Sequence, residues 1–173
     1  MTILDATRIC LRKAFVFQGR ATRAEFWWFS GAVVLAFAAA LGLDRLLFPV
    51  AMMRGMLPVS AGLFALTAIP MLSAGWRRMQ DVGRPGHQML LPLLAYLGFV
   101  AALWMVSAVF FAVLRQRVYD PWLYDAVKLF GLIVFPAGAA VGVFAGILIL
   151  WWLAKPGQTG HNAYGPDPRQ VTQ

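Results

Sequence analysis

Four long apolar stretches that contain no charged residue constrain the fold more than any other feature. The hydrocarbon core of a bilayer is crossed by about 20 apolar residues in a helix, and each stretch is long enough to cross it. Inside a bilayer the backbone must satisfy its own hydrogen bonds, and the period-2 alternation of a membrane barrel is absent. The sequence therefore predicts an all-α, polytopic membrane protein, a four-transmembrane-helix bundle forming a single domain over residues 1–173. The expected spans are 26–43, 55–76, 89–114 and 129–154.

The composition agrees with a membrane protein and argues against nucleic-acid binding. The chain is 61% hydrophobic and 13% charged, whereas soluble domains are about 45–50% apolar and about 25% charged. Its net charge of +8 comes from Lys and Arg that flank the apolar stretches, with no basic stripe along one helix. We therefore expect no nucleic-acid partner.

The distribution of Lys and Arg predicts the orientation in the membrane. Ten of the 15 basic residues fall in the N-terminal segment, the loop 77–88 and the tail 155–173, and five fall in the two other connections. Basic residues concentrate on the cytoplasmic side of a membrane. Both termini and the loop 77–88 are thus expected in the cytoplasm.

The residues before the first span carry two local signals. From Ile3 to Phe17, apolar residues gather on one side of a helical wheel and charged residues on the other, with one exception, which favours a helix lying on the inner leaflet over a disordered basic lead. Thr22 and Glu25 have the spacing of a capping box directly before the first span. That pair predicts where the first membrane helix begins.

The last span has small residues every four positions, at Gly138, Gly142 and Gly146. Such a ridge lets another helix backbone approach closely in a membrane. We expect the ridge to contact a helix of the same chain, because four helices need internal contacts first. The alternative is contact with a second copy, which would make a homo-oligomer.

Polar residues cluster in the three segments expected on the cytoplasmic side. Arg77 and Arg78 precede Asp81 by four and three positions and share its face if the second helix continues past the membrane, where Gly83 would end it. We expect Glu25 and Asp81 to pair with arginines across these segments, with the proline-rich tail folded over them. The candidate site residues are Arg20, Arg23, Glu25, Arg77, Arg78, Asp81, Arg84, Asn162 and Tyr164.

The same three segments resemble a known family. Residues 17–27 read Phe-x-Gly-Arg-x-x-Arg-x-Glu-Phe-Trp, residues 77–84 read Arg-Arg-Met-Gln-Asp-x-Gly-Arg, and residues 160–165 read Gly-x-Asn-x-Tyr-Gly. With these motifs in this order, the chain resembles the small bacterial inner-membrane proteins of the domain of unknown function 805 family (DUF805). The resemblance implies location in the bacterial inner membrane, and it implies no reaction, because the family has no established activity.

Three positions depart from the family pattern in the loop after the second span. Gln80 stands where the family usually has His, so any proton or metal role of that histidine is missing here. Pro85 and His87 replace the usual Ser and Trp, which removes an aromatic anchor from the loop.

Several chemical functions are unsupported by the sequence. The spans hold no ionisable residue for coupled transport, and two histidines with one cysteine make neither a metal site nor a disulfide. No catalytic motif or cofactor motif is present. We therefore expect no enzyme activity, no cofactor and no metal.

Two roles remain for the Arg, Asp and Glu side chains: an ion-pair clamp between helix ends, or an anion site. The favoured function is a non-catalytic membrane factor that binds either a membrane lipid or a membrane-protein partner. Anionic lipids are among the expected lipid ligands. The alternative is a small uncoupled channel or facilitator.

Overall fold

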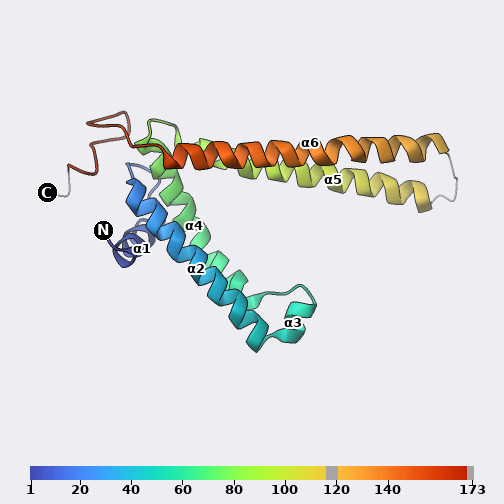
Figure 1. Ribbon diagram of the computed structural model, residues 1–173, viewed down its shortest axis with the longest axis horizontal. Coiled ribbons are helices and arrows are strands. Elements are labelled where there is room, and N and C mark those ends of the chain that lie inside the picture. The colour runs from blue at the N-terminus through green and yellow to red at the C-terminus, as the bar shows by residue number, and fades with distance from the viewer. Residues whose placement is uncertain (116–120, 171–173) are drawn as a thin grey trace. The chain divides into compact units, whose positions relative to one another are not determined.

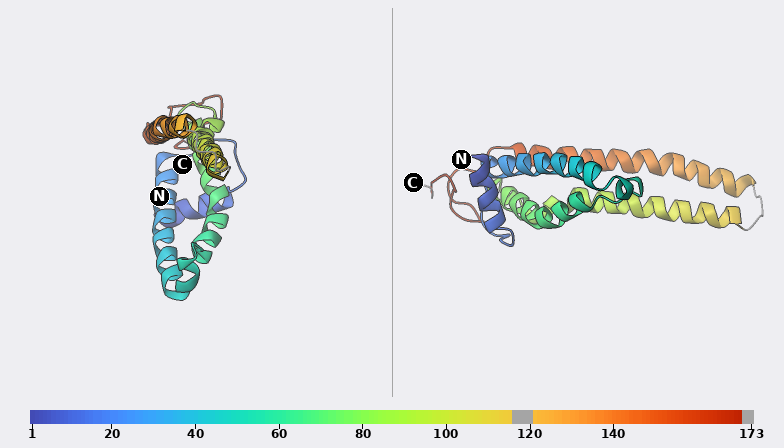
Figure 2. Two further views of the ribbon diagram at one scale, coloured as in Figure 1. Left: turned by 90° about the vertical axis from the view of Figure 1, so that its right-hand side faces the viewer. Right: turned by 90° about the horizontal axis from the view of Figure 1, so that it is seen from below.

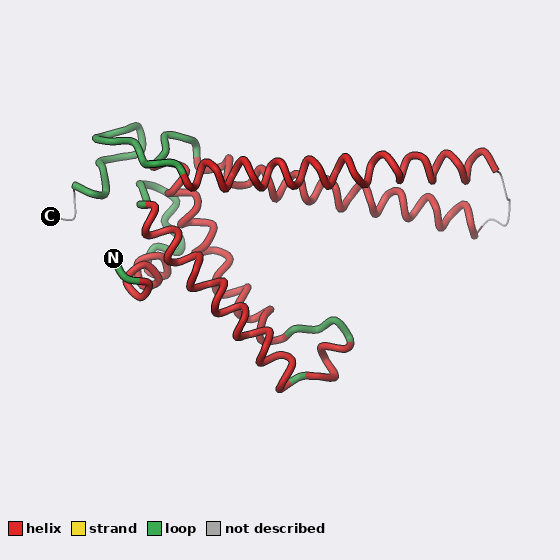
Figure 3. The backbone as a smooth tube through the Cα atoms, in the orientation of Figure 1, coloured by secondary structure: helices red, strands yellow, loops and turns green. Residues whose placement is uncertain are grey.

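The computed structural model describes residues 1–115 and 121–170, and these residues are almost entirely helices joined by loops (Figures 1 and 3). The one β feature among them is an isolated bridge between Asn162 and Gly165. The elements in chain order are α1 (Ile3–Arg12), α2 (Arg23–Leu47), α3 (Pro49–Met53), α4 (Pro58–Asp81), a 3₁₀ helix (Gly86–Leu90), α5 (Leu91–Arg115) and α6 (Pro121–Ala154).

Among the described residues, four helices are long and apolar enough to cross a membrane. They correspond to the four expected spans, and the all-α polytopic fold is confirmed. The matching segments are Arg23–Leu47, Pro58–Asp81, Gly86–Ala108 and Lys128–Ala154.

The described residues fall into two compact units. The first contains Met1–Met89 and Trp152–Gln173, and the second contains Leu90–Trp151. The expectation of one membrane domain over the whole chain remains a prediction.

In the first unit, α2 and α4 form a hairpin and α1 packs against both of them. Both views in Figure 2 show α1 running crosswise to the two long helices. The side chains of Ala6 and Cys10 are buried in this contact, while Leu4 is 78% exposed. The predicted N-terminal helix exists but ends at Arg12 rather than Phe17, and its apolar side is divided between a buried part and an exposed part.

Three membrane helices, α2, α4 and α6, are longer than the apolar runs that predicted them, whereas α5 is not. α2 extends to Leu47 because Asp44 continues the helix with its side chain fully buried. α6 begins at Pro121, a residue that is favourable in the first turn of a helix. The short helix α3 lies in the connection between the first two expected spans. Arg117, which the sequence places in the third connection, lies outside the described residues.

In the second unit, α5 and α6 lie side by side as a hairpin (Figure 1). The rings of Phe99 and Phe135 meet edge to face, with centroids 5.7 Å apart. A Cβ added at Gly138 would collide with the Phe99 ring, whereas nothing described lies within 4 Å of such an atom at Gly142 or Gly146. Gly138 therefore permits close packing inside the hairpin, and the partner expected for Gly142 and Gly146 remains a prediction.

Candidate functional site

Thr22 begins α2 as expected, but Glu25 does not complete a capping box. The Thr22 hydroxyl accepts a hydrogen bond from the Glu25 backbone N–H at 3.1 Å. The Glu25 carboxylate instead accepts from the Arg77 guanidinium on α4, with Nη1 and Oε1 2.6 Å apart. Both side chains are buried. Leaving a buried charge without a partner of opposite sign costs more free energy than leaving one backbone N–H at a helix end without a side-chain acceptor.

Asp81, the last residue of α4, pairs with two arginines. Arg20, which precedes α2, donates from Nε to Oδ1 at 2.9 Å. Arg78, one helical turn before Asp81, donates from Nη1 to the other carboxylate oxygen. Both oxygens of Asp81 are therefore engaged, and the start of α2 is joined to the end of α4.

The remaining donors of Arg20 and Arg78 bind main-chain carbonyls in the last turn of α6 and in the tail after it. Arg20 donates to the carbonyls of Gly160, at 2.6 Å, and Gln158. Arg78 donates to the carbonyls of Leu153, at 3.0 Å, and Lys155. The expected pairing of Glu25 and Asp81 with arginines, and the folding of the tail over them, are both present. We call Arg20, Glu25, Arg77, Arg78 and Asp81 the ion-pair cluster.

The chain around Asp81 is shaped to let the tail approach. Gly83 follows α4 with a φ of 77°, and the N–H groups of Gly83 and Arg84 donate to the carbonyls of Gln80 and Met79, the two bonds of a Schellman motif. This ends α4 as expected. A Cβ at Gly157 would collide with the Asp81 carboxylate, so a glycine is needed where the tail passes it.

The other predicted site residues lie around the ion-pair cluster without joining it. Arg84 stacks on the Trp152 ring, 3.9 Å from its centroid. Arg23 is exposed and donates to the Ala154 carbonyl at 3.3 Å. The Asn162 side chain donates to the Gln80 carbonyl at 3.1 Å and accepts from the Tyr164 N–H at 2.9 Å, which fixes the turn of the tail.

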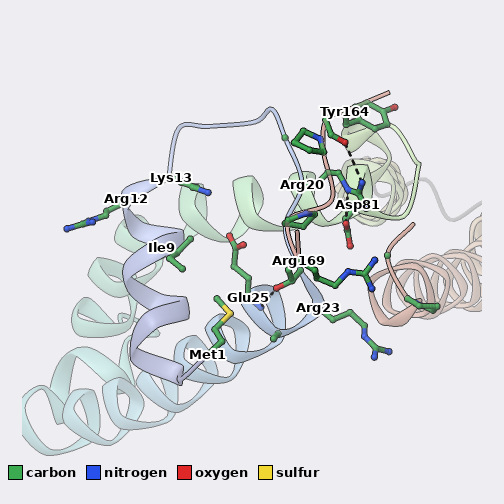
Figure 4. Close-up of a pocket in the computed structure, with 18 residues that line it drawn as sticks. Met1, Ile9, Arg12, Lys13, Arg20, Arg23, Glu25, Asp81, Tyr164 and Arg169 are labelled. Carbon is green, nitrogen blue, oxygen red and sulfur yellow. Dashed lines mark hydrogen bonds and ion pairs between the residues drawn. The ribbon is translucent and has the colours of Figure 1, made fainter. Parts of the chain in front are cut away.

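A cavity of about 1030 Å³ opens beside the ion-pair cluster, between α1, the start of α2 and the tail (Figure 4). Five basic side chains and two carboxylates line it, a net charge of +3. Apolar atoms of Met1 and Ile9 form part of its wall. The charged lining residues are Arg12, Lys13, Arg20, Arg23, Arg169, Glu25 and Asp81.

Three of the basic lining residues, Arg12, Lys13 and Arg169, were not among the predicted site residues. Arg169 is held by Asp167, with Nη2 and Oδ2 2.7 Å apart, and its side chain is still 52% exposed. The hydrogen bonds from Arg169 lower the pKa of Asp167. The closeness of Asp167 and Arg169 in the sequence could have indicated their ion pair. Arg12 and Lys13 line the cavity because α1 packs beside it, and no sequence pattern indicates that packing.

Cys10 lies on the buried side of α1, with its Sγ 3.8 Å from Glu25 Oε1. Burial, and after it the charge of Glu25, raises the pKa of the thiol to about 12. In the described part of the chain, no group of three or more His, Cys, Asp or Glu side chains is placed to hold a metal ion.

Four apolar helices, two of them fastened at one end by a buried ion-pair cluster, define a multi-pass helical membrane protein. The chain belongs to the family described as "Protein of unknown function (DUF805)", whose model matches residues 14–166, and the resemblance seen in the three motifs is confirmed.

Two curated relatives are proteins named "Inner membrane protein YhaI", from Escherichia coli strain K12 and from Escherichia coli O157:H7. Each is 32% identical to this chain over 102 residues, which covers 55% of this chain and 72% of the relative. No solved structure matches the chain.

Proposed function

We propose that this protein is a non-catalytic factor of the bacterial inner membrane that binds the phosphate of an anionic membrane lipid in the cavity beside the ion-pair cluster. Both termini, and with them the cavity, lie on the cytoplasmic side. The observation that carries this proposal is the excess of basic side chains around the cavity, five against two carboxylates.

The ion-pair cluster provides the frame of the site rather than its ligand contacts. The donors of Arg20 and Arg78 are directed to Asp81 and to carbonyls of the tail. Removing either arginine would take a hydrogen-bond donor from the buried Asp81 carboxylate and from carbonyl groups of the chain that it binds, which is unfavourable. The two proposed roles of the cluster residues, clamp and anion site, are thus divided between different side chains.

The charge available to a ligand comes from the edge of the cavity. Arg12, Lys13, Arg23 and Arg169 are all exposed. Guanidinium and ammonium groups bind phosphate oxygens through charge-assisted hydrogen bonds, and each basic residue close to an anionic lipid surface contributes about 1 kcal/mol. We call these four residues the basic rim.

The position of α1 favours a ligand that arrives from the membrane. α1 lies crosswise to α2 and α4, the direction of a helix in the plane of a bilayer that those two helices cross (Figure 2). Ser73, in α4, donates to the carbonyls of Lys13 at 2.7 Å and Val16 at 2.9 Å. At about 1.5 Å per residue, Ser73 is about 12 Å from the end of α4 at Asp81, and this distance supports a position of the end of α1 at headgroup depth.

Exposed apolar side chains in α1 and just after it also support a position of α1 in the plane of the bilayer surface. Leu4 and Phe15 are each 78% exposed, and Leu11 is 49% exposed. In an interfacial helix such side chains enter the boundary between headgroups and acyl chains. The cavity, whose wall includes Ile9, Arg12 and Lys13, then opens at the level of the lipid phosphates.

The proposal is tested by measuring lipid adducts of the detergent-purified protein by native mass spectrometry. Phosphatidylglycerol and phosphatidylcholine with the same acyl chains are compared for the wild type and for Lys13→Gln/Arg23→Gln. We expect the wild type to prefer phosphatidylglycerol. We expect the double variant to bind it roughly 30-fold more weakly, because two contributions of about 1 kcal/mol are lost.

The matched control is Arg45→Gln/Arg54→Gln, which removes the same charge from the opposite end of the α2–α4 hairpin. Phosphatidylglycerol binding within about twofold of the wild type is expected for this variant. Equal losses in the two double variants would mean that net charge alone attracts the lipid, and would contradict a site at the cavity.

A further inference from the structure

The two carboxylates that line the cavity differ in how many of their oxygens are occupied. Asp81 accepts from Arg20 through Oδ1 and from Arg78 through Oδ2. Glu25 accepts from Arg77 through Oε1, which is also the oxygen nearest to the Cys10 thiol. Among the described residues, no donor reaches Glu25 Oε2.

The free oxygen of Glu25 lies in a buried position at the cavity. The Glu25 side chain is 7% exposed, and Glu25 is one of the residues that line the cavity. Figure 4 shows its carboxylate directed into the space beside α1, toward the side where Lys13 and Ile9 lie. Because Arg77 occupies one oxygen and no described protein donor occupies the other, this carboxylate is suited to accept a hydrogen bond from a ligand in the cavity.

The surroundings of Glu25 restrict the kind of donor. An ammonium group entering the cavity would approach the basic rim and the guanidinium of Arg20, and the charge of Glu25 is already balanced by Arg77. Like charges in a cavity of low dielectric repel strongly. A hydroxyl donates a hydrogen bond without bringing a positive charge.

We propose that the cavity selects a phosphodiester lipid whose headgroup ends in a hydroxyl, as a glycerol headgroup does, with the phosphate at the basic rim and the hydroxyl donating to Glu25 Oε2. This inference rests on the proposed lipid-binding function and adds the headgroup class. Lys13, which lies on the same side of the cavity as the Glu25 carboxylate, is the basic residue placed to hold the phosphate next to that hydroxyl.

Two lipids of equal charge distinguish the contribution of the headgroup hydroxyl to binding from that of the phosphate. Phosphatidylglycerol and phosphatidylmethanol are both singly charged phosphodiesters, and the second lacks headgroup hydroxyls. With matched acyl chains, native mass spectrometry of the wild type is expected to give about tenfold tighter binding of phosphatidylglycerol, the value of one hydrogen bond to a charged acceptor. Equal binding of the two would overturn the role of Glu25 and leave the phosphate site standing.

A third lipid tests the choice of a hydroxyl over an ammonium group. Phosphatidylethanolamine, added under the same conditions, is expected to bind more weakly than phosphatidylglycerol. Binding as tight as that of phosphatidylglycerol would overturn the headgroup class. Equal binding of all three and of phosphatidylcholine would overturn the proposed function together with this inference.

The variant Glu25→Gln provides an independent test. Its one amide oxygen is needed by the buried Arg77, which already has Nε and Nη2 without a partner among the described atoms, so the amide N–H₂ would face the cavity. The expected result is a smaller preference for phosphatidylglycerol over phosphatidylmethanol, because the hydroxyl then meets a neutral amide N–H₂ instead of a carboxylate, with phosphatidylmethanol binding kept. A preference unchanged from the wild type would contradict the inference.

If Glu25→Gln does not fold, the comparison of lipids on the wild type decides alone. Asp125→Asn is the matched control for the variant, because it removes one carboxylate charge from an exposed position that does not line the cavity. This control is expected to keep the tenfold preference, and loss of the preference there would show that it follows net charge rather than Glu25.

Discussion

Asp44 on α2 caps the N-terminus of α4 through Ser60. The Asp44 carboxylate accepts from the Ser60 N–H at 2.9 Å, from the Ser60 hydroxyl at 2.7 Å and from the Val59 N–H at 2.8 Å. Asp44 is fully buried, and α4 has no cap from its own chain segment, since Leu57 stands at the N-cap. A carboxylate there also interacts favourably with the helix dipole. The far end of the α2–α4 hairpin is thus fastened by a single side chain.

Replacing Asp44 with Ala should lower the free energy of unfolding by about 2 kcal/mol, because two buried N–H groups lose their acceptor. Asp44→Asn keeps one acceptor oxygen and should lose less. Unfolding in mixed detergent micelles, followed by circular dichroism, measures both. The neighbouring exposed Arg45→Ala should be close to wild type; a loss as large as that of Asp44→Ala would argue against the cap.

Replacing Arg78 with Gln should release the tail. Arg78 is fully buried and joins Asp81 to the carbonyls of Leu153 and Lys155. Breaking a buried ion pair costs about 3–5 kcal/mol. Limited chymotrypsin digestion should cut after Tyr164, in the tail, much faster in the variant than in the wild type.

The control for this experiment is Arg84→Gln, which removes a stacking contact with Trp152 and a bond to Gln88 from a half-buried side chain. Its cleavage rate should remain near that of the wild type. Similar rates for Arg78→Gln and the wild type would show that the tail is held by other contacts.

The thiol of Cys10 should be unreactive in the folded protein and should make stability depend on alkaline pH. Burial raises its pKa from 9.0 to about 12, so the folded protein keeps the thiol proton at pH values where the unfolded chain loses it. Stability contributed by this group is complete below pH 9.0 and falls as the pH rises toward about 12. Maleimide labelling at pH 8 should be slow in mild detergent and fast after unfolding in dodecyl sulfate.

The variant Cys10→Ser removes this titration, and its unfolding free energy should vary less between pH 9 and pH 11 than that of the wild type. Rapid labelling of the folded wild-type protein would mean that α1 separates from α2 and α4 readily, against the buried position of Cys10.

The membrane helices and the residues of the ion-pair cluster could be predicted because their signals are local. An uncharged apolar run predicts a span from its length alone, and Arg78 and Asp81 are within one helical turn. Thr22 was predicted as a cap for the same reason. These inferences need no knowledge of which segments meet in space.

Contacts between distant segments explain what the sequence did not predict. Glu25 has the spacing of a capping residue, yet its partner Arg77 is 52 positions away. Asp44 lies outside the expected first span because a charge normally ends an apolar run, and the hydrogen bonds from Val59 and Ser60 make its burial favourable. In the tail, Arg20 donates its hydrogen bonds to backbone carbonyl groups. Every residue carries such a group, so no side-chain pattern in the tail could reveal these bonds.

That use of main-chain carbonyls has a consequence for how the tail tolerates change. Arg20 and Arg78 bind only main-chain oxygens of the tail, so the side chains at the exposed positions 156, 158 and 159 are free to vary without loss of these bonds. Gly157 and Gly160 are not, because a larger residue at 157 would displace the Asp81 carboxylate and Gly160 has a φ of 75°.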